Sequence, residues 1–230
     1  MNHVFVKLFF NNTVMPFYLS NELDVKFGDY VIVETKYGND MGKVLSNRVE
    51  LKANETMKVL SKATEKDIQT FNANRKKDQL EDPKIKGILK KYHPDIHFIG
   101  CYFMLDGTKL IINYISDTRI DFRETVKELA SIYKTRIEMR QISSREGFKL
   151  KGGIGICGRE CCCSSFYHLK QHITASMVRE QNLSEINAKT IGPCGKLLCC
   201  LSYESDLYKN GKHVCSCSKT NVNKILENVV

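Results

Sequence analysis

Residues 157–163 read Cys-Gly-Arg-Glu-Cys-Cys-Cys, and residues 194–200 read Cys-Gly-Lys-Leu-Leu-Cys-Cys. Both stretches follow the pattern Cys-Gly-(Arg or Lys)-x-x-Cys-Cys, and thirty residues separate them. Glycines also precede each copy. Because chance rarely repeats such a spacing, the sequence predicts that the repeated cysteines form a site. The cysteines of the repeated pattern are Cys157, Cys162, Cys163, Cys194, Cys199 and Cys200.

The chain has 230 residues, ten cysteines and 42% hydrophobic residues, which is enough for a core without disulfides. The sequence has no leader-like start and no apolar run of membrane-spanning length. We therefore expect a cytoplasmic protein without membrane insertion, in which thiols stay reduced. Ten reduced cysteines indicate metal, cluster or redox chemistry.

Three interpretations of the cysteines compete. In the first, deprotonated thiols bind an iron–sulfur cluster or a zinc ion, and Arg159 and Lys196 help to lower their pKa values. In the second, the cysteines are redox switches. In the third they are small buried hydrophobes, which is the better interpretation for Cys101 in its apolar strand. The chain has no pair of Cys-x2-Cys motifs, which favours a cluster over zinc without excluding zinc.

The vicinal cysteines restrict the geometry of any shared site. Neighbouring side chains on a strand point to opposite faces, so at most one sulfur of each Cys-Cys pair would join a given site. A shared site further requires Cys157 and Cys194 to approach one another in the fold.

The order of hydrophobic patterns predicts an α+β protein. Asp106-Gly107 is a strong hairpin signal between two apolar strands, and Asp121 with Glu124 predicts a capping box at the start of a helix. Asp82-Pro83 is expected to interrupt the preceding helical segment, which gives either a helical hairpin or a kinked helix. The predicted divisions are a β-rich unit (1–60), a basic helical segment (61–95), a β-β-α-β core (96–150), a cysteine-rich repeat region (151–208) and a tail (209–230).

The chain is basic, with a net charge of +9, and residues 58–91 alone hold ten Lys or Arg against five Asp or Glu. Such an excess suits RNA or an acidic protein partner. The alternative is a solvated helical face. No ladder of aromatic residues of the kind used for base stacking is present.

Motifs of common enzyme classes are missing from the sequence. There is no Walker loop, no dinucleotide fingerprint and no nucleophile elbow. The residues therefore give little support to a conventional enzyme, and a redox enzyme that uses a cysteine pair is a less favoured alternative.

Further residues around the repeat complete a recognisable pattern. Gly152-Gly153-Ile154-Gly155 precedes the first copy, Gln181-Asn182-Leu183-Ser184 lies between the copies, and Leu201-x-Tyr203-Glu204 follows the second. Together these residues resemble the bacterial YaaT/RicT family, whose members contain the polymerase-suppressor (Psp-one) C-terminal domain. The resemblance covers about residues 3–208. Cys161 departs from it, because it adds a thiol where the family has an apolar residue.

The resemblance implies a cytoplasmic regulatory or adaptor subunit, not a stand-alone enzyme, in a complex with two small helical partner proteins. It further implies iron–sulfur clusters, of 4Fe–4S type, held by cysteines among the six named above. In that family the complex promotes mRNA processing by the endoribonuclease RNase Y and affects sporulation and biofilm formation. The alternative function is a stand-alone zinc- or thiol-dependent nucleic-acid-binding protein.

Overall fold

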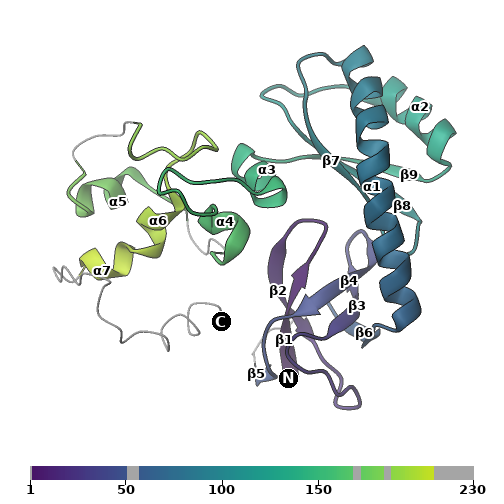
Figure 1. The fold of residues 1–230 in the computed structure, drawn as a ribbon, viewed down its shortest axis with the longest axis horizontal. Helices are drawn as coiled ribbons and strands as arrows, with labels where there is room; N and C mark the ends of the chain where they lie inside the picture. The colour runs from purple at the N-terminus through teal and green to yellow at the C-terminus, as the bar shows by residue number, and fades with distance from the viewer. Residues whose placement is uncertain (1, 51–56, 168–171, 184–187, 210–230) are drawn as a thin grey trace. The chain divides into compact units, whose positions relative to one another are not determined.

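The computed structural model describes residues 2–50, 57–167, 172–183 and 188–209 (Figure 1). The chain divides into two compact units, residues 1–143 and residues 144–230. Most of the predicted tail, from residue 210 onward, lies outside the described residues. No helix in the described part of the chain is long and apolar enough to cross a membrane.

A six-stranded antiparallel sheet occupies the N-terminal part of the first unit. Its strands lie in the order β2-β1-β4-β3-β6, and β5 pairs with β1. Apolar residues at alternate positions of β3, such as Val31 and Val33, are buried on one side of this sheet. Glu34, which lies next to Val33 in the same strand, points to the other side and is exposed. Its strands are β1 (Asn2–Leu8), β2 (Thr13–Tyr18), β3 (Tyr30–Thr35), β4 (Gly38–Val44), β5 (Val49–Glu50) and β6 (Val59–Lys62).

A second sheet contains the hairpin that Asp106-Gly107 predicts. Strands β7 (His97–Phe103) and β8 (Lys109–Ile115) are antiparallel, and Gly107 has φ +67° in the turn. Helix α2 (Arg123–Tyr133) then leads to β9 (Arg136–Gln141), which runs parallel to β8. The structure is thus the mixed α+β protein that the sequence predicts.

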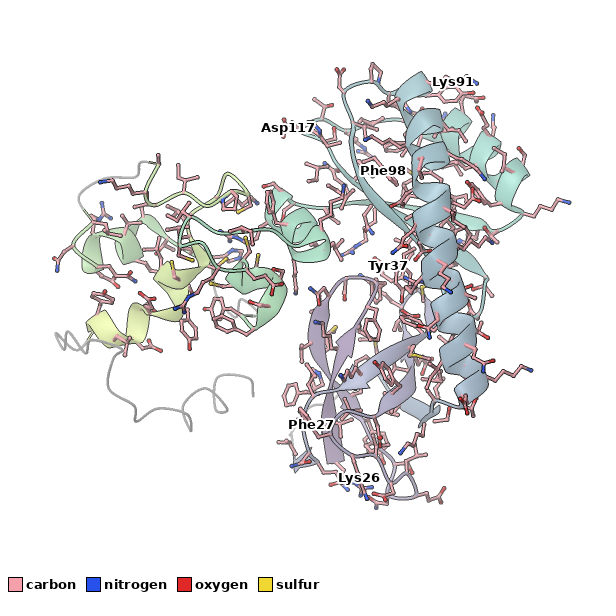
Figure 2. All side chains as sticks on the ribbon, in the orientation of Figure 1. Lys26, Phe27, Tyr37, Lys91, Phe98 and Asp117 are labelled. Atoms are coloured by element: carbon pink, nitrogen blue, oxygen red, sulfur yellow. The ribbon has the colours of Figure 1, made fainter. Side chains whose placement is uncertain are left out.

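The β7-β8-β9 sheet buries both of its faces. On one face Tyr102, Met104 and Ile111 join the same core as the first sheet. Figure 2 labels Tyr37, whose ring meets the Phe10 ring edge-on at 5.4 Å in that core. The other face packs against α1 and α2 through a second core of buried residues, which comprises Ile85, Leu89, Cys101, Phe103, Leu110, Ile112 and Leu129. Cys101 is therefore the buried hydrophobe that its strand predicts.

Helix α1 (Glu65–Tyr92) is one continuous helix of 28 residues. Thr64 caps it in a capping box with Asp67. The helical hairpin considered for Asp82-Pro83 is wrong, since Pro83 lies inside one helix. Pro83 and Gln79 are both exposed, so water can satisfy the carbonyl that loses its N–H partner. Packing of apolar side chains before and after Pro83 then holds the two halves in one helix.

The predicted capping box at the start of α2 is also wrong. The helix begins at Arg123 with Phe122 at the N-cap, and no side chain caps it there. Asp121 Oδ1 instead accepts a hydrogen bond from Arg123 N at 3.1 Å, which closes a local turn just before the helix. Glu124 pairs with Lys127 on the helix surface.

The outer edge of β7 is covered by polar side chains of α1. Asp78 Oδ1 accepts a hydrogen bond from Phe103 N at 2.8 Å, and Asp82 Oδ1 accepts one from Cys101 N at 2.8 Å. The two carboxylates lie four residues apart on one helical face, and the two amides lie two residues apart on one strand edge. Arg75 completes the contact through an ion pair with Asp78 at 2.8 Å. Helix α1 thus satisfies amides that an exposed sheet edge would leave open.

We predict that Asp82→Ala destabilises the protein by about 1–2 kcal/mol, because the amide of Cys101 loses its acceptor while alanine slightly favours the helix. Urea unfolding followed by circular dichroism measures the change. Gln79→Ala, at an exposed position one turn earlier, is the matched control and should shift stability by less than about 0.5 kcal/mol. Equal effects of the two substitutions would contradict a role for the carboxylate.

Asp40 of β4 carries a fully buried carboxyl group, which lies at the core between the first sheet and the β7-β8-β9 sheet. Its Oδ2 accepts a hydrogen bond from the Tyr102 hydroxyl at 2.8 Å, while Oδ1 has no partner among the described residues. Burial raises the pKa of Asp40 from its ordinary value of 3.8 to about 6, against the opposing effect of the Tyr102 hydrogen bond. Between these two values the folded protein holds a proton that the unfolded chain has released.

This raised pKa predicts that Asp40 lowers stability as the pH rises from about 4 to about 7, by up to about 3 kcal/mol. Asp40→Asn cannot ionise, so its stability relative to the wild type should increase over the same interval. Thermal unfolding of both proteins at the two ends of this pH range tests the sign. A difference between the proteins that does not change with pH would show that Asp40 is already ionised at the lower pH.

Candidate functional site

The two cysteine copies fold into the same local structure. We call residues 153–165 the first knuckle and residues 190–202 the second knuckle; equivalent positions differ by 37 in number. In the first, Gly155 N donates to Arg159 O at 2.7 Å, and in the second Gly192 N donates to Lys196 O at 2.8 Å. Each knuckle then closes with equivalent bonds, which are Gly158 N to Gly155 O, Gly195 N to Gly192 O, Cys161 N to Gly153 O and Leu198 N to Thr190 O, each at 2.9 Å.

The glycine after each leading cysteine has a left-handed backbone. Gly158 has φ +77° and Gly195 has φ +72°, and a Cβ atom at either position would meet no atom within 4 Å. A lack of space for a side chain therefore does not explain the glycines at these positions. The backbone conformation requires it, because a side chain there costs about 1–2 kcal/mol.

The vicinal cysteines begin short helices and do not lie on strands. Cys162 and Cys163 open α4 (Cys162–Ser165), and Cys199 and Cys200 open α6 (Cys199–Tyr203). Successive side chains on a helix diverge by much less than the half-turn of a strand. The expectation that at most one thiol of each pair joins a given site assumed a strand, but the backbone of each pair is helical. Both members of each pair line the same cavity.

The knuckles face one another with approximate two-fold symmetry. The Cys163 thiol hydrogen-bonds the Cys199 sulfur, and Cys162 lies close enough to Cys200 for their charges to interact. The two contacts are equivalent, because Cys163 corresponds to Cys200 and Cys199 corresponds to Cys162 when the knuckles are exchanged. The equivalent aromatic residues Phe166 and Tyr203 also meet, with their rings edge-on at 5.3 Å.

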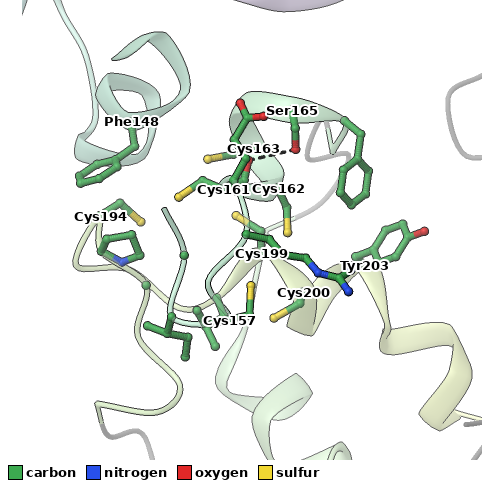
Figure 3. A pocket seen from close by; sticks show the side chains of 18 of the residues that line it. Phe148, Cys157, Cys161, Cys162, Cys163, Ser165, Cys194, Cys199, Cys200 and Tyr203 are labelled. Atoms are coloured by element: carbon green, nitrogen blue, oxygen red, sulfur yellow. Dashed lines mark hydrogen bonds between the residues drawn. The ribbon is translucent and has the colours of Figure 1, made fainter. Parts of the chain in front are cut away.

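A cavity of about 640 Å³ lies between the knuckles (Figure 3). The structure brings all six predicted cysteines to it, and Cys161 as well. Phe148 and Tyr203 form part of its apolar wall. Within the described residues, no three His, Cys, Asp or Glu side chains are grouped closely enough to hold a single metal ion. The thiols surround the cavity and do not converge on one point.

Helix α3 (Ser144–Lys151) supplies two further residues that the sequence did not single out. The Arg145 guanidinium donates a hydrogen bond to Leu197 O in the second knuckle. Phe148 packs so tightly that a Cβ at Gly153 would lie 3.1 Å from its ring. No pattern around Arg145 or Phe148 marks them, whereas Phe166 and Tyr203 could have been found by extending the repeat three residues past the vicinal cysteines.

Electrostatics distinguish one thiol from the others. The hydrogen bond from Cys163 and then the charge of Arg145 lower the pKa of Cys199 to about 6, against its burial. Burial and then the charge of Glu204 raise the pKa of Cys200 to about 11, and burial also raises the pKa of Cys161 and Cys162. Most of these thiols are thus protonated at neutral pH, so binding of a metal must release protons.

Comparisons with known proteins agree with the repeat and with the second sheet. Residues 57–142 match the family described as PSP1 C-terminal conserved region, and residues 172–215 match the PSP1-like protein third domain. The chain is 35% identical over 196 residues to "Stage 0 sporulation protein YaaT" of Bacillus subtilis (strain 168), which covers 84% of this chain and 71% of that protein. No solved structure matches.

The knuckle geometry predicts opposite effects for two glycine-to-alanine substitutions. Gly195→Ala should destabilise the protein by about 1–2 kcal/mol, because alanine must adopt the left-handed conformation. Gly87→Ala is the matched control, since it is equally free of neighbours within 4 Å but lies in helix α1. It should stabilise by up to about 1 kcal/mol. Urea unfolding measures both, and a neutral Gly195→Ala would refute the strain.

Proposed function

Since the chain belongs to the YaaT/PSP1 family, we propose that this regulatory protein is a non-enzymatic adaptor in RNA processing whose thiols bind an iron–sulfur cluster. The single observation that supports the proposal best is the gathering of seven cysteines from two equivalent knuckles around one cavity. The name of the B. subtilis relative suggests a role in the control of sporulation. The family resemblance suggests two small helical partner proteins and an RNase Y-type endoribonuclease as its partners.

The chemistry of the cavity suits an iron–sulfur cluster. Thiolates are the ligands that such clusters, zinc and copper(I) prefer. A cluster spreads its ligands over several metal atoms, so it tolerates thiols that surround a space and do not meet at one point. The residues that would hold it are drawn from Cys157, Cys162, Cys163, Cys194, Cys199 and Cys200. Such a cluster would supply an oxygen- and redox-sensitive link between the two knuckles.

The surface around the cavity supports binding of a partner protein. Ile154 and Ile156 of the first knuckle are 65% and 59% exposed, and Phe166 after it is 48% exposed. Large apolar side chains that gather at one place on a surface commonly mark a protein interface. We propose that an apolar helical face of a partner covers them and shields the thiols from water.

A stand-alone zinc- or thiol-dependent nucleic-acid-binding protein is the second candidate. The observation that favours it is that both knuckles come from one chain, so this chain alone offers more thiols than the four that a zinc site needs. The two candidates differ in which metal is held, and in whether a partner is needed to hold it.

We predict substoichiometric, air-sensitive iron and sulfide in the isolated chain after anaerobic purification, rising when the partner proteins are co-expressed. Cys199→Ser or Cys162→Ser should lower both metal content and partner binding, because ligation contributes directly to assembly. Cys101→Ala is the control: it removes a buried thiol of the other unit and should leave the iron content unchanged. Full zinc occupancy that is stable in air and independent of partners would instead favour the second candidate.

A further inference from the structure

The acidic residues in the middle of helix α1 are turned toward the protein. Asp78 and Asp82 bind the amides of β7, as described above. Glu81 accepts a hydrogen bond from the Tyr133 hydroxyl at 2.9 Å. Asp78 is buried, and Glu81 and Asp82 are only partly exposed. The middle of α1 therefore presents its negative charges to its own fold and not to solvent.

Between residues 69 and 92, the exposed surface of α1 carries only positive charge. From residue 69 to residue 92, every exposed residue that is charged is a lysine. We call these the lysine face: Lys76, Lys77, Lys84, Lys86, Lys90 and Lys91. Figure 2 shows α1 on the outside of the first unit, with Lys91 near its C-terminal end. The excess of lysine in residues 58–91 is thus concentrated on one surface.

Local interactions leave most of this charge available. Lys84 pairs with Glu81 at 3.0 Å and Lys91 pairs with Glu128 at 3.3 Å, but these lysine side chains remain 68% and 63% exposed. Exposed pairs of this kind are weak and are screened by salt. No ion pair is found for Lys76, Lys86 or Lys90 among the described residues.

We propose that the lysine face binds the phosphate backbone of RNA. Lys76 and Lys91 are fifteen residues apart, which places them about 22 Å apart along the helix axis. Along the axis of duplex DNA each strand presents one phosphate per about 3.4 Å, and at that spacing about six phosphates lie along the same length. Six lysines over the same length match that charge. The choice of RNA over DNA rests on the proposed function.

The form of the surface predicts binding without sequence preference. Base readout from one strand requires aromatic side chains for stacking, and Tyr92 is the one aromatic residue exposed between residues 69 and 92. Its hydroxyl is engaged by Glu128 at 2.6 Å. The major groove of an RNA duplex is too narrow to admit a helix. Lysine ammonium groups on a convex helix therefore contact phosphates only.

The test uses the full-length protein and a fluorescein-labelled single-stranded RNA of mixed sequence, with affinity read from fluorescence anisotropy. Between about 50 and 200 mM salt, the logarithm of the wild-type affinity should fall against log salt with a slope of about −2 to −4. The variant Lys76→Glu/Lys86→Glu/Lys90→Glu should bind at least tenfold more weakly at the lower salt, with a slope shallower by about 2.

Two further variants make the result specific. The control Lys26→Glu/Lys36→Glu/Arg119→Glu changes net charge equally at exposed positions outside α1, and it should retain nearly all affinity. The milder Lys76→Gln/Lys86→Gln/Lys90→Gln removes the charges without placing acids near the helix C-terminus, so weakened binding by this variant cannot be assigned to a melted helix. Circular dichroism verifies the helix content of each protein.

Several outcomes would overturn the inference. They are absence of RNA binding by the wild type, equal losses in the lysine-face and control variants, and binding of anionic lipid vesicles or an acidic peptide in preference to RNA. The proposed function is tested separately by iron content and partner binding. If the lysine-face variant keeps both but loses RNA, and RNA processing continues in the cell, the adaptor role stands while RNA contact through α1 is not needed for it.

Discussion

The carboxylates of Asp78 and Asp82 close the outer edge of β7, and the orientation of α1 follows from that contact. An edge strand needs acceptors for its outward amides, and a helix can supply them at a spacing of four residues to match every second amide of a strand. Once these two side chains face the strand, helical geometry places Lys76, Lys84 and Lys91 on the opposite side. The basic surface is thus a consequence of the contact between Asp78, Asp82 and the edge of β7. That contact fixes the rotation of α1 about its axis and so decides which residues face solvent.

The thiol site depends on backbone constraints of a different kind. Each knuckle turns at a glycine in the left-handed region, and the turn directs the vicinal cysteines into the first turn of a short helix. Because the cavity is lined largely by two copies of one structure, the same three backbone hydrogen bonds in each copy position most of its thiols. The lysine face belongs to the first unit, and every residue that lines the cavity belongs to the second.

The sequence predicted the features that local chemistry decides. Repeated spacing identified the six cysteines that line the cavity, and Asp106-Gly107 identified the hairpin. It failed where tertiary contacts compete with local preference. Pro83 was expected to end a helix, but buried neighbours on both sides hold α1 together. The vicinal cysteines were treated as strand residues, because no residue pattern shows that a tight glycine turn will begin a helix. Arg145 comes to the site through packing of α3, which spacing cannot reveal.

The two-fold arrangement of the knuckles is broken by charge. The hydrogen bond from Cys163 and then the charge of Arg145 lower the pKa of Cys199, whereas burial raises the pKa of Cys162, its equivalent in the first knuckle. Burial and then the charge of Glu204 also raise the pKa of Cys200. Equivalent backbones therefore hold thiols with unequal affinity for protons. A cation bound by Cys161, Cys162 or Cys200 must displace protons, while at Cys199 it meets a thiolate that Cys163 and Arg145 already stabilise. Sequence duplication supplied the shape of the site, and the residues around the copies made its two halves chemically different.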